Sequence, residues 1–557
     1  MQKILSAVFT LLLSLSGPAA ALSAAGSAEA PARVGIGAAK RDLTLAEAIE
    51  RALKANLEIE IERTMIETAK EDASGARGYL DPLFRLSPQI EDRNIPTASP
   101  LLGAEGKLEQ TLGTLSGSWD QRLPWWGSSL RVALENNRQT TTNPFEGLSP
   151  FNTARLGITA TFPLLRNREI DRERAGLRIT SKQVDLSGTA FEVKAIDVIA
   201  RVQESYWNLV AARQNVMVTS EAVDLAREQL ARTKRQIESG TLPEVELAAA
   251  EAELERRVDT WYASIGLVTT LENALKSLIA GSREETVWNE EIVPVEERMV
   301  EPPQAGAVRE ASDTAVAKRP ELRLVDTRKE VNEIQAELAR NQTRTQLHLV
   351  GGYSVAGLTG ALASIRNPFS QSLGGQFARI NELSELAGLA PLEPPAFGET
   401  PRVLLGGYGA MWQQVFEGRF PTAFAGVQID FTARNRRAKA ELAKTAVEER
   451  RLQLERRQIE QRIEAQVRNA LQAIQTARQR ITAAEASVRA AEEKLASEIR
   501  LFQTGESTNF LVLTRQNELA DSRQRAVVAR LDFNKAVAQA QQAMGLTLES
   551  YRITLSP

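Results

Sequence analysis

The sequence of 557 residues contains no cysteine and a single histidine, His348. Without cysteine the chain cannot form a disulfide, a cysteine-ligated zinc site or an iron–sulfur cluster, and it offers no cysteine for lipid attachment. Any Ser-His-Asp triad would have to use His348, which lies in an alternating stretch typical of a strand face. We find no nucleophile and base constellation, no metal-ligand cluster and no phosphate-binding glycine loop. The sequence therefore predicts neither an enzyme nor a cofactor or metal site.

The sequence also lacks a charge excess and a long apolar run. Lys and Arg total 68 against 71 Asp and Glu, a net charge of −3, so no basic surplus indicates nucleic acid as a partner. No segment after the amino-terminal region reaches about 18 consecutive apolar residues, which argues against a membrane-spanning helix. Residues 1–25 combine Lys3, an apolar run and a stretch of small residues, an order that predicts a cleavable secretory signal peptide. We expect an exported protein that is not a lipoprotein.

The chain shows an internal repeat at an offset of about 265 residues. It aligns residues 236–240, Gln-Ile-Glu-Ser-Gly, with residues 501–505, Leu-Phe-Gln-Thr-Gly. Each half has a shorter helical segment, an alternating region with glycine and aromatic residues, a long helix, a glycine turn and a return helix. This order predicts a tandem structural repeat. The predicted segments are a signal peptide at 1–25, an N-terminal linker at 26–42, repeat 1 at 43–281, a linker or equatorial segment at 282–311, repeat 2 at 312–549 and a C-terminal tail at 550–557.

Apolar residues recur every seven positions along the two long helical stretches, and small residues follow three positions later in most cases. The recurring residues are Val202, Leu209, Val216, Val223, Leu230 and Ile237 in the first half, and Val467, Ile474, Ile481, Val488, Leu495 and Phe502 in the second. A strict seven-residue period predicts coiled-coil packing. Each long helix is expected to pair antiparallel with its return helix through the turn at Gly240 or Gly505. A helix over about 172–239 would be roughly 100 Å long.

The alternating regions, at about 83–166 and 346–431, predict strands with one apolar face. Such strands suit an outer-membrane β-barrel, and the alternative is an ordinary soluble sheet with an aromatic core. The region 92–152 is longer than one strand pair needs, which leaves the number of strands open. Residues 358–402 are rich in Gly, Pro and Ser and predict a long external loop. The aromatic residues expected in interfacial girdles are Trp125, Trp126, Trp412, Phe416, Phe420 and Phe424.

The ordered set of features resembles the TolC-type outer-membrane efflux proteins. Residues 43–56, which begin Leu-Thr-Leu-Ala-Glu-Ala-Ile and end at Asn56, are similar to the opening helix of that family. Residues 319–322, Arg-Pro-Glu-Leu, are similar to its counterpart in the second repeat. The turns at 240–243 and 505–508 are similar to the periplasmic tips of the family. The resemblance covers nearly the whole mature chain.

The resemblance implies a mainly α-helical fold with transmembrane β structure. It implies a homotrimer in which each chain gives four strands to a twelve-stranded outer-membrane barrel and its helices to a tunnel through the periplasm. The implied function is a passive exit duct of a tripartite efflux or type I secretion system, with a periplasmic adaptor and an inner-membrane pump of the RND or ABC type as partners. The tip residues expected to contact the adaptor are Gly240, Thr241, Leu242, Pro243, Gly505, Glu506, Ser507 and Thr508.

The second tip departs from the pattern of the resembled family, whose members often carry acidic residues just beyond it. Here residues 509–514 contain no carboxylate, whereas the first tip has Glu244 and Glu246. We hypothesise that a ring of one of these glutamates, together with Asn509, lines the pore aperture and repels anions. The alternative is that they are solvated charges favoured by the helix dipole. For the whole chain, the alternative function is a periplasmic coiled-coil scaffold without transport activity.

Overall fold

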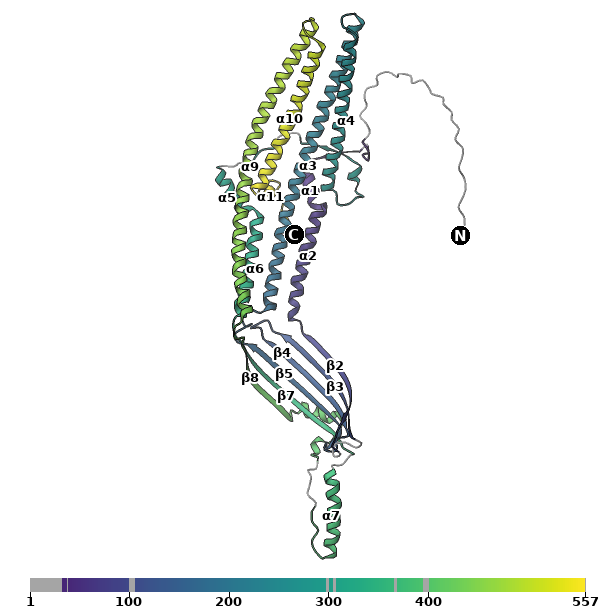
Figure 1. Cartoon of the computed structure of the whole chain (residues 1–557), viewed down its shortest axis with the longest axis vertical. Helices are drawn as coiled ribbons and strands as arrows, with labels where there is room; N and C mark the ends of the chain where they lie inside the picture. The colour runs from purple at the N-terminus through teal and green to yellow at the C-terminus, as the bar shows by residue number, and fades with distance from the viewer. Residues whose placement is uncertain are drawn as a thin grey trace, which may run out of the picture. The chain divides into compact units, whose positions relative to one another are not determined.

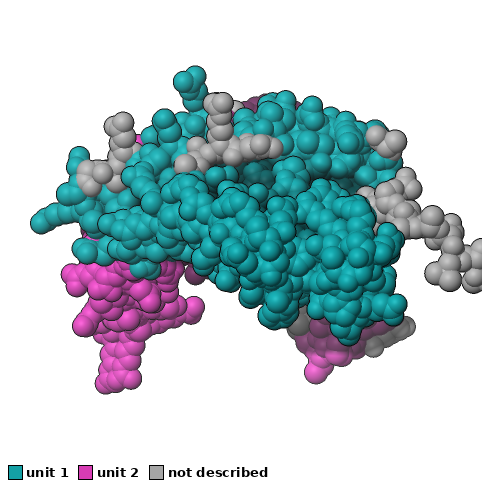
Figure 2. Space-filling view, turned by 90° about the horizontal axis from the view of Figure 1, so that it is seen from above, with its two compact units in different colours: residues 1–57, 195–313, 466–553 teal, residues 58–194, 314–465, 554–557 magenta. Residues whose placement is uncertain are grey.

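A computed structural model describes residues 33–37, 39–99, 106–296, 300–303, 307–364, 368–393 and 400–555. The chain divides into two compact units, coloured separately in Figure 2. Unit 1 comprises residues 1–57, 195–313 and 466–553, and unit 2 comprises residues 58–194, 314–465 and 554–557. The predicted signal peptide at 1–25 lies outside the described residues. None of the helices in the described ranges is long and apolar enough to cross a membrane.

The helices of the two halves have matching lengths (Figure 1). The long helices α3 (Arg172–Glu238) and α9 (Arg436–Gln503) contain 67 and 68 residues, and the return helices α4 (Val245–Ile279) and α10 (Asn509–Ala543) contain 35 residues each. The remaining helices are α1 (Leu45–Ala55), α2 (Leu57–Arg77), α5 (Val308–Lys318), α6 (Pro320–Gln342), α7 (Pro368–Leu386), α8 (Tyr408–Phe416) and α11 (Thr547–Ser550), with short 3-10 turns at Gly78–Leu80, Thr286–Asn289 and Arg402–Leu404. The predicted tandem repeat agrees with these lengths and stays a prediction.

The seven-residue pattern marks buried positions on the long helices. Most of the recurring apolar residues of α9 are buried, including Val467 and Leu495, and Val512 and Leu519 of α10 are buried as well. Ala491, Leu495, Val512 and Leu519 form one core cluster, so α9 and α10 pack against each other close to their shared turn. Burial of each of the larger side chains, Leu495, Val512 and Leu519, stabilises the pair by about 1.5–3 kcal/mol. The hydrophobic pattern therefore holds the α9–α10 hairpin together.

Unit 1 also contains the start of the described chain. Strand β1 (Lys40–Leu43) pairs in parallel with β6 (Glu291–Pro294), which brings the N-terminal linker beside the segment between the repeats. Helix α1 follows with a capping box, because the Thr44 side chain accepts from the Glu47 N–H and the Glu47 carboxylate accepts from the Thr44 N–H. The buried face of α1 is formed by Leu45, Ala48, Ile49 and Ala52.

Unit 2 contains a six-stranded antiparallel sheet, in which the strands lie side by side in the order β2-β3-β4-β5-β7-β8 (Figure 1). Proline occurs within both edge strands, as Pro88 in β2 and Pro421 in β8, where a missing N–H is tolerated. The strands are β2 (Leu83–Pro96), β3 (Lys107–Arg122), β4 (Ser129–Thr141), β5 (Leu148–Pro163), β7 (Gln346–Leu362) and β8 (Phe420–Asp430).

The number of strands corrects the expectation of four strands per chain. The four strands β2 to β5 come from the first half and the two strands β7 and β8 from the second, so the chain supplies six. A twelve-stranded barrel made of three chains with four strands each therefore does not fit this sheet. The additional strands lie in the region 92–152, whose length had left the number of strands open.

The segment expected to be a long external loop is only partly irregular. Residues 358–362 extend β7, and α7 occupies Pro368–Leu386. Helix α8 follows and packs against β5 and β7 through Met411 and Val415, which share a core cluster with Ala154. Gly357 permits this contact, since a Cβ atom there would lie 2.4 Å from the Met411 carbonyl oxygen.

The six aromatic residues expected in girdles occupy three different settings. Trp125 and Trp126 are exposed in the turn between β3 and β4. Trp412 and Phe416 lie on α8, not on a strand, and their rings stack with centroids 5.8 Å apart. Phe420 and Phe424 lie on β8, where Phe424 is paired with Gly352. Only Phe420 and Phe424 lie on a strand, and the expectation that the six residues form interfacial girdles stays a prediction.

Candidate functional site

The two hairpin tips of unit 1 have the same backbone geometry. At the end of α3, the Gly240 N–H donates to the Ile237 carbonyl at 2.9 Å and the Thr241 N–H donates to the Gln236 carbonyl at 2.9 Å. At the end of α9, the Gly505 N–H donates to Phe502 at 3.2 Å and the Glu506 N–H donates to Leu501 at 2.9 Å. These paired bonds are the Schellman arrangement that ends a helix, and they require a left-handed residue.

Both tip glycines have the positive φ that this ending needs, 73° at Gly240 and 82° at Gly505. A Cβ atom at either position would meet nothing within 4 Å, so the backbone conformation and not the available space selects glycine. The glycine turns predicted from the sequence are therefore observed at both hairpin tips.

Polar side chains complete the two tips in different ways. In the first tip the Thr241 hydroxyl donates to the Gln236 carbonyl at 2.7 Å, and Pro243 precedes α4. In the second tip Thr508 is the N-cap of α10, since its hydroxyl oxygen accepts from the Leu511 N–H, while Ser507 donates to the Glu498 carboxylate. The other predicted tip residues, Leu242 and Glu506, make backbone contacts to the ends of the long helices.

Of the three aperture candidates, the structure brings two together. The Asn509 side chain is buried, with 2% of its surface exposed, and its Nδ2 donates to Glu246 Oε2 at 3.2 Å. Gln229, on α3, donates through Nε2 to Asn509 Oδ1 at 2.7 Å. Asn509 on α10 therefore joins both helices of the first hairpin, and we call Gln229, Glu246 and Asn509 the tip latch. Glu244 is exposed at the N-cap of α4 and takes no part in it.

Gln229 was not predicted from the sequence. It lies outside the seven-residue seam, and its partner Asn509 is 280 residues away in the chain. The one available signal was the uncharged stretch that begins at Asn509, which drew attention to the second tip but gave no partner.

The sheet of unit 2 has two chemically different faces, which follow from its register. We call one the apolar face and the other the polar face. The apolar face carries Phe84, Leu86, Ile90, Leu115, Trp119, Val132, Leu134, Leu156, Ile158, Leu349, Tyr353, Val355, Val427 and Ile429. The polar face carries Arg85, Ser87, Gln89, Glu91, Ser116, Ser118, Asp120, Arg131, Glu135, Asn137, Arg155, Thr159, His348, Ser354, Thr422, Gln428 and Asp430, together with Phe420 and Phe424.

Much of the apolar face is exposed in the single chain. Ile90 is 85% exposed, Phe84 75% and Ile429 61%, and Tyr353 and Ile158 are each about half exposed. An exposed apolar surface that crosses six strands indicates contact with lipid or with another protein. Helix α8 covers only the part of this face around Ala154 and Val355.

A cavity of about 1100 Å³ lies against the polar face at the end where β2 begins and β5 ends. Its lining includes Arg85, Asp120, Arg131 and His348 from the strands and Asp171, the residue that precedes α3. Across β3 and β4, the Arg131 guanidinium donates to the Asp120 carboxylate at 2.5 Å. This end of the polar face therefore borders a hydrated, charged space. The strand-face setting expected for His348 is observed.

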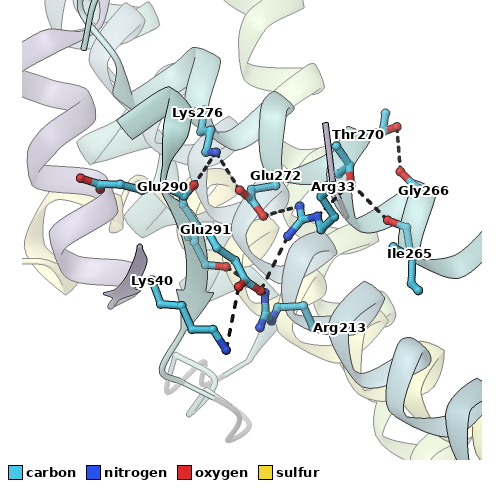
Figure 3. Close-up of polar contacts among 12 residues, drawn as sticks. Arg33, Lys40, Arg213, Ile265, Gly266, Thr270, Glu272, Lys276, Glu290 and Glu291 are labelled. Carbon is cyan, nitrogen blue, oxygen red and sulfur yellow. Dashed lines mark hydrogen bonds and ion pairs between the residues drawn. The ribbon is translucent and has the colours of Figure 1, made fainter. Parts of the chain in front are cut away.

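A buried ion network fixes the described N-terminal segment to α4 in unit 1 (Figure 3). Glu272 and Lys276 are fully buried and lie 2.7 Å apart, and Arg33 donates to the second Glu272 oxygen at 2.6 Å. Lys276 Nζ also donates to the backbone carbonyls of Trp288 at 3.1 Å and Glu290 at 2.6 Å. Lys276 thus donates to two backbone carbonyls and forms an ion pair with Glu272, and together these contacts offset the cost of burying the charge.

Glu291 extends this network towards β6 (Figure 3). Its carboxylate accepts from Arg213 at 2.8 Å and lies 3.7 Å from Arg33 and 4.0 Å from Lys40. Burial raises the pKa of Glu291, but the hydrogen bond and charge of Arg213, with the charges of Lys40 and Arg33, outweigh it and leave the pKa below its ordinary value. The network thus favours the ionised carboxylate.

Tyr206 forms a second buried polar contact in unit 1. Its hydroxyl lies 3.0 Å from the Leu43 carbonyl oxygen and also contacts the Glu296 carboxylate. Glu296 in turn accepts from the Leu45 N–H, the first amide of α1, at 3.0 Å. Burial, and then the hydrogen bond to Glu296, raise the pKa of Tyr206 well above its ordinary value. These contacts hold the start of α1 against α3.

Within the described ranges, no group of three or more His, Cys, Asp or Glu side chains could hold a metal ion. The charged groups that cluster in unit 1 are paired with opposite charges and backbone carbonyls, as structural ion pairs are. The arrangement therefore consists of long helical hairpins that end in glycine turns, and of a sheet with one apolar and one polar face.

Residues 127–281 of the chain match the family described as outer membrane efflux protein. The match includes β4, β5, α3 and α4, and the fold is that of solved outer-membrane channels, with a helical part and a β part. The resemblance inferred from the sequence motifs is therefore confirmed. These comparisons show the fold of an outer-membrane channel, and the matched segment is similar to outer membrane efflux proteins. A comparison with curated protein sequences found no match.

The solved structures that the chain is similar to include three bacterial channels. The CmeC outer membrane channel of Campylobacter jejuni aligns over 90% of this chain and 86% of its own, with 15% identity and a TM-score of 0.59. The outer membrane protein VceC of Vibrio cholerae aligns over 90% and 96%, with 12% identity and a TM-score of 0.58. The MtrE outer membrane channel of Neisseria gonorrhoeae, solved in its open state, aligns over 90% and 89%, with 16% identity and a TM-score of 0.56.

Proposed function

We propose that this protein is a passive exit duct in the cell outer membrane. The observation that carries the proposal is that one face of the sheet is apolar and exposed, while the opposite face carries charged and hydroxylated side chains. Strands that alternate in this way suit a barrel whose outer surface meets lipid and whose inner surface meets water. Substrates would cross the membrane by hydrated conduction along the polar face.

The functional assembly is a homotrimer. In the described part of the chain the outward-facing backbone groups of the two edge strands have no strand partner, and lipid cannot satisfy them, so further copies close the ring. The helices form a tunnel in the periplasm, for which the 67 residues of α3 give a length of roughly 100 Å. The amino-terminal signal at 1–25 directs export, and the two repeats at 43–281 and 312–549 supply equivalent hairpins.

The tips carry the contact with the rest of the export system. A periplasmic adaptor binds the turns at 240–243 and 505–508, and an inner-membrane pump of the RND or ABC type supplies the energy. Separation of the hairpins opens the tunnel, and the tip latch opposes it. The exposed Glu244 lines the aperture and favours cations, whereas the buried Asn509 acts through the tip latch.

Two neighbouring residues of β5 provide the test, because they are on opposite faces of the sheet. Ile158 is on the apolar face and Thr159 is on the polar face. If the apolar face meets lipid, Ile158→Arg destabilises the inserted barrel by about 2–4 kcal/mol near the bilayer midplane, whereas Thr159→Arg is tolerated. We expect the amount of protein in the outer-membrane fraction to fall for Ile158→Arg alone.

The same fractionation separates this proposal from the periplasmic scaffold. A channel requires detergent for extraction and elutes as a trimer. A protein that is soluble without detergent, and that tolerates arginine equally at both positions, would contradict the channel and favour the scaffold.

A further inference from the structure

Within the described residues, neither edge of the six-stranded sheet is paired with a further strand of the same chain. Every residue of the edge strand β8 is exposed, and every residue of the opposite edge strand β2 is exposed except Glu91. Exposed edges of 11 and 14 residues present backbone donors and acceptors that can pair with another strand. In a membrane these groups must be paired, so each edge needs a neighbour.

We propose that β8 of one copy pairs with β2 of the next, so that all six strands of every copy enter the barrel wall. The inference rests on the proposed homotrimeric channel and states how it closes. Three copies of a six-stranded sheet make a ring of eighteen strands in place of the expected twelve. The occupant of each edge is therefore a second copy of this chain.

The directions of the strands favour this closure. All neighbouring strands in the sheet are antiparallel, so among six strands the first and the last run in opposite directions. Pairing of β8 with β2 of the next copy therefore continues the antiparallel order around the ring. The faces also continue, because Leu86 and Ile90 of β2 and Val427 and Ile429 of β8 are on the same apolar face.

The β3–β4 hairpin is paired into the sheet along its length, so it belongs to the same continuous sheet as the other strands. Strand β3 pairs with β2 along the whole of β2, from Leu83 to Pro96, and with β4 from Gln110 to Arg122. A Cβ atom at Gly117 of β3 would lie 3.7 Å from the Leu86 side chain and 3.9 Å from the Leu134 side chain. The apolar face is thus packed continuously from β2 across β3 to β4.

Six strands per copy change the bore of the barrel. With strands about 4.8 Å apart and tilted by about 40°, an eighteen-stranded ring is roughly 36 Å across between backbones, and a twelve-stranded ring roughly 24 Å. Barrels of 16 to 18 strands leave an aqueous channel. The membrane part is then too wide to limit the size of the substrate, and the hairpin tips set that limit. The duct suits bulky, hydrated solutes.

Disulfide cross-linking tests which strand borders β8, and the natural chain has no cysteine to interfere. Thr422 of β8 is replaced by cysteine and combined with a second cysteine at one polar-face position of β2, in a scan over Arg85, Ser87, Gln89, Glu91 and Arg93. The comparison series places the second cysteine in β4, at Arg131, Ala133, Glu135 or Asn137. Cysteines bridge only if their Cα atoms are about 4.4–6.8 Å apart, which restricts the bond to adjacent strands.

We expect at least one member of the β2 series to give covalent trimers on non-reducing gels after mild oxidation of outer membranes, and the β4 series to give none. If β4 and not β2 is linked to β8, only four strands of each copy are in the wall, and the eighteen-stranded ring is overturned while the channel stands. A detergent-extracted trimer in which neither series is linked also overturns it. A soluble monomer or dimer would instead refute the proposed channel.

Discussion

Replacement of Asn509 by leucine removes both hydrogen bonds of the tip latch while keeping a side chain of similar size. Gln229, itself 2% exposed, then loses the acceptor that lies 2.7 Å from its amide, and the Glu246 carboxylate loses a donor at 3.2 Å. An unsatisfied buried amide costs about 1–3 kcal/mol, and a hydrogen bond to a charged group contributes about 1.5–3 kcal/mol. Because neighbouring effects are not additive, we expect a combined loss of about 2–4 kcal/mol.

This free energy is lost from the arrangement in which the two hairpins are joined. Since each 1.4 kcal/mol is a factor of ten, even the lower value shifts the balance between joined and separated hairpins by roughly thirtyfold. In planar lipid bilayers, Asn509→Leu channels should therefore show a higher open probability than the natural protein. Circular dichroism and trimer elution should stay unchanged, because the change leaves the coiled-coil seam intact.

Asn517 provides a matched control on the same helix. Its side chain accepts a single exposed hydrogen bond from Arg256 at 3.2 Å, so Asn517→Leu should leave gating unchanged. In a double-mutant cycle, Gln229→Leu combined with Asn509→Leu should cost less than the sum of the two changes, because no buried amide is then left without a partner. An open probability equal to that of the natural channel for Asn509→Leu, or full additivity in the cycle, would refute the latch.

Three further predictions concern the tips and the ion network. Gly505→Val forces a branched side chain into a left-handed backbone at a cost of about 1–2 kcal/mol, so it should weaken adaptor binding in pull-down assays. Gly505→Asn should retain that binding. Equal binding by both variants would argue against a role of the tip. Glu244→Gln should lower the preference for cations measured from reversal potentials, and an unchanged preference would remove Glu244 from the aperture. Because the folded state lowers the pKa of Glu291, its contribution to stability is present above its ordinary value of 4.5 and is lost as the pH falls through the lower folded-state pKa. The melting temperature should fall with pH in this acid range, and the fall should be smaller for Arg213→Gln than for the natural protein. An identical pH dependence of the two melting temperatures would count against the network.

The helical part of the fold could be predicted closely because its signals are local. A helix was expected over about 172–239 and is observed at Arg172–Glu238, and both glycine turns are at the expected positions. The absence of Gly and Pro and the seven-residue period suffice for this result. The hairpins form between neighbouring segments of the chain, so no distant contact was needed to place them.

The sheet was predicted less completely because some of its strands lack a clear pattern. Strand β2 contains Pro88 and the charged run Glu91-Asp92-Arg93, which interrupts the alternation of apolar and polar residues. Helix α8 has a glycine-rich, aromatic sequence that suggested a strand. Its helical form depends on the packing of Met411 on the bare backbone of Gly357, a contact that local sequence cannot indicate. Tertiary contacts decided both cases.

The candidate site was predicted in part for the same reason. The tip glycines, Thr508 as an N-cap and the first-turn Glu246 are local features that sequence rules can place. The contact between Glu246 and Asn509 joins residues 263 positions apart on different hairpins. Only the three-dimensional packing of the hairpins shows that Glu246 is bound by an amide, while Glu244 stays exposed.

The distribution of burial in unit 1 indicates why gating belongs at the tips. The region around the N-terminal segment holds fully buried side chains, among them Tyr206, Leu275, Lys276 and Ile292. By contrast, no residue is buried in 234–249 or 496–508, the stretches that include the two turns. Segments with few buried contacts open at low free energy, while those with many stay closed until the whole unit unfolds. The buried hydrogen bond between Gln229 and Asn509 lies next to these stretches in the chain and is thus expected to oppose their opening. A change there should alter the opening of the tunnel without unfolding the helices.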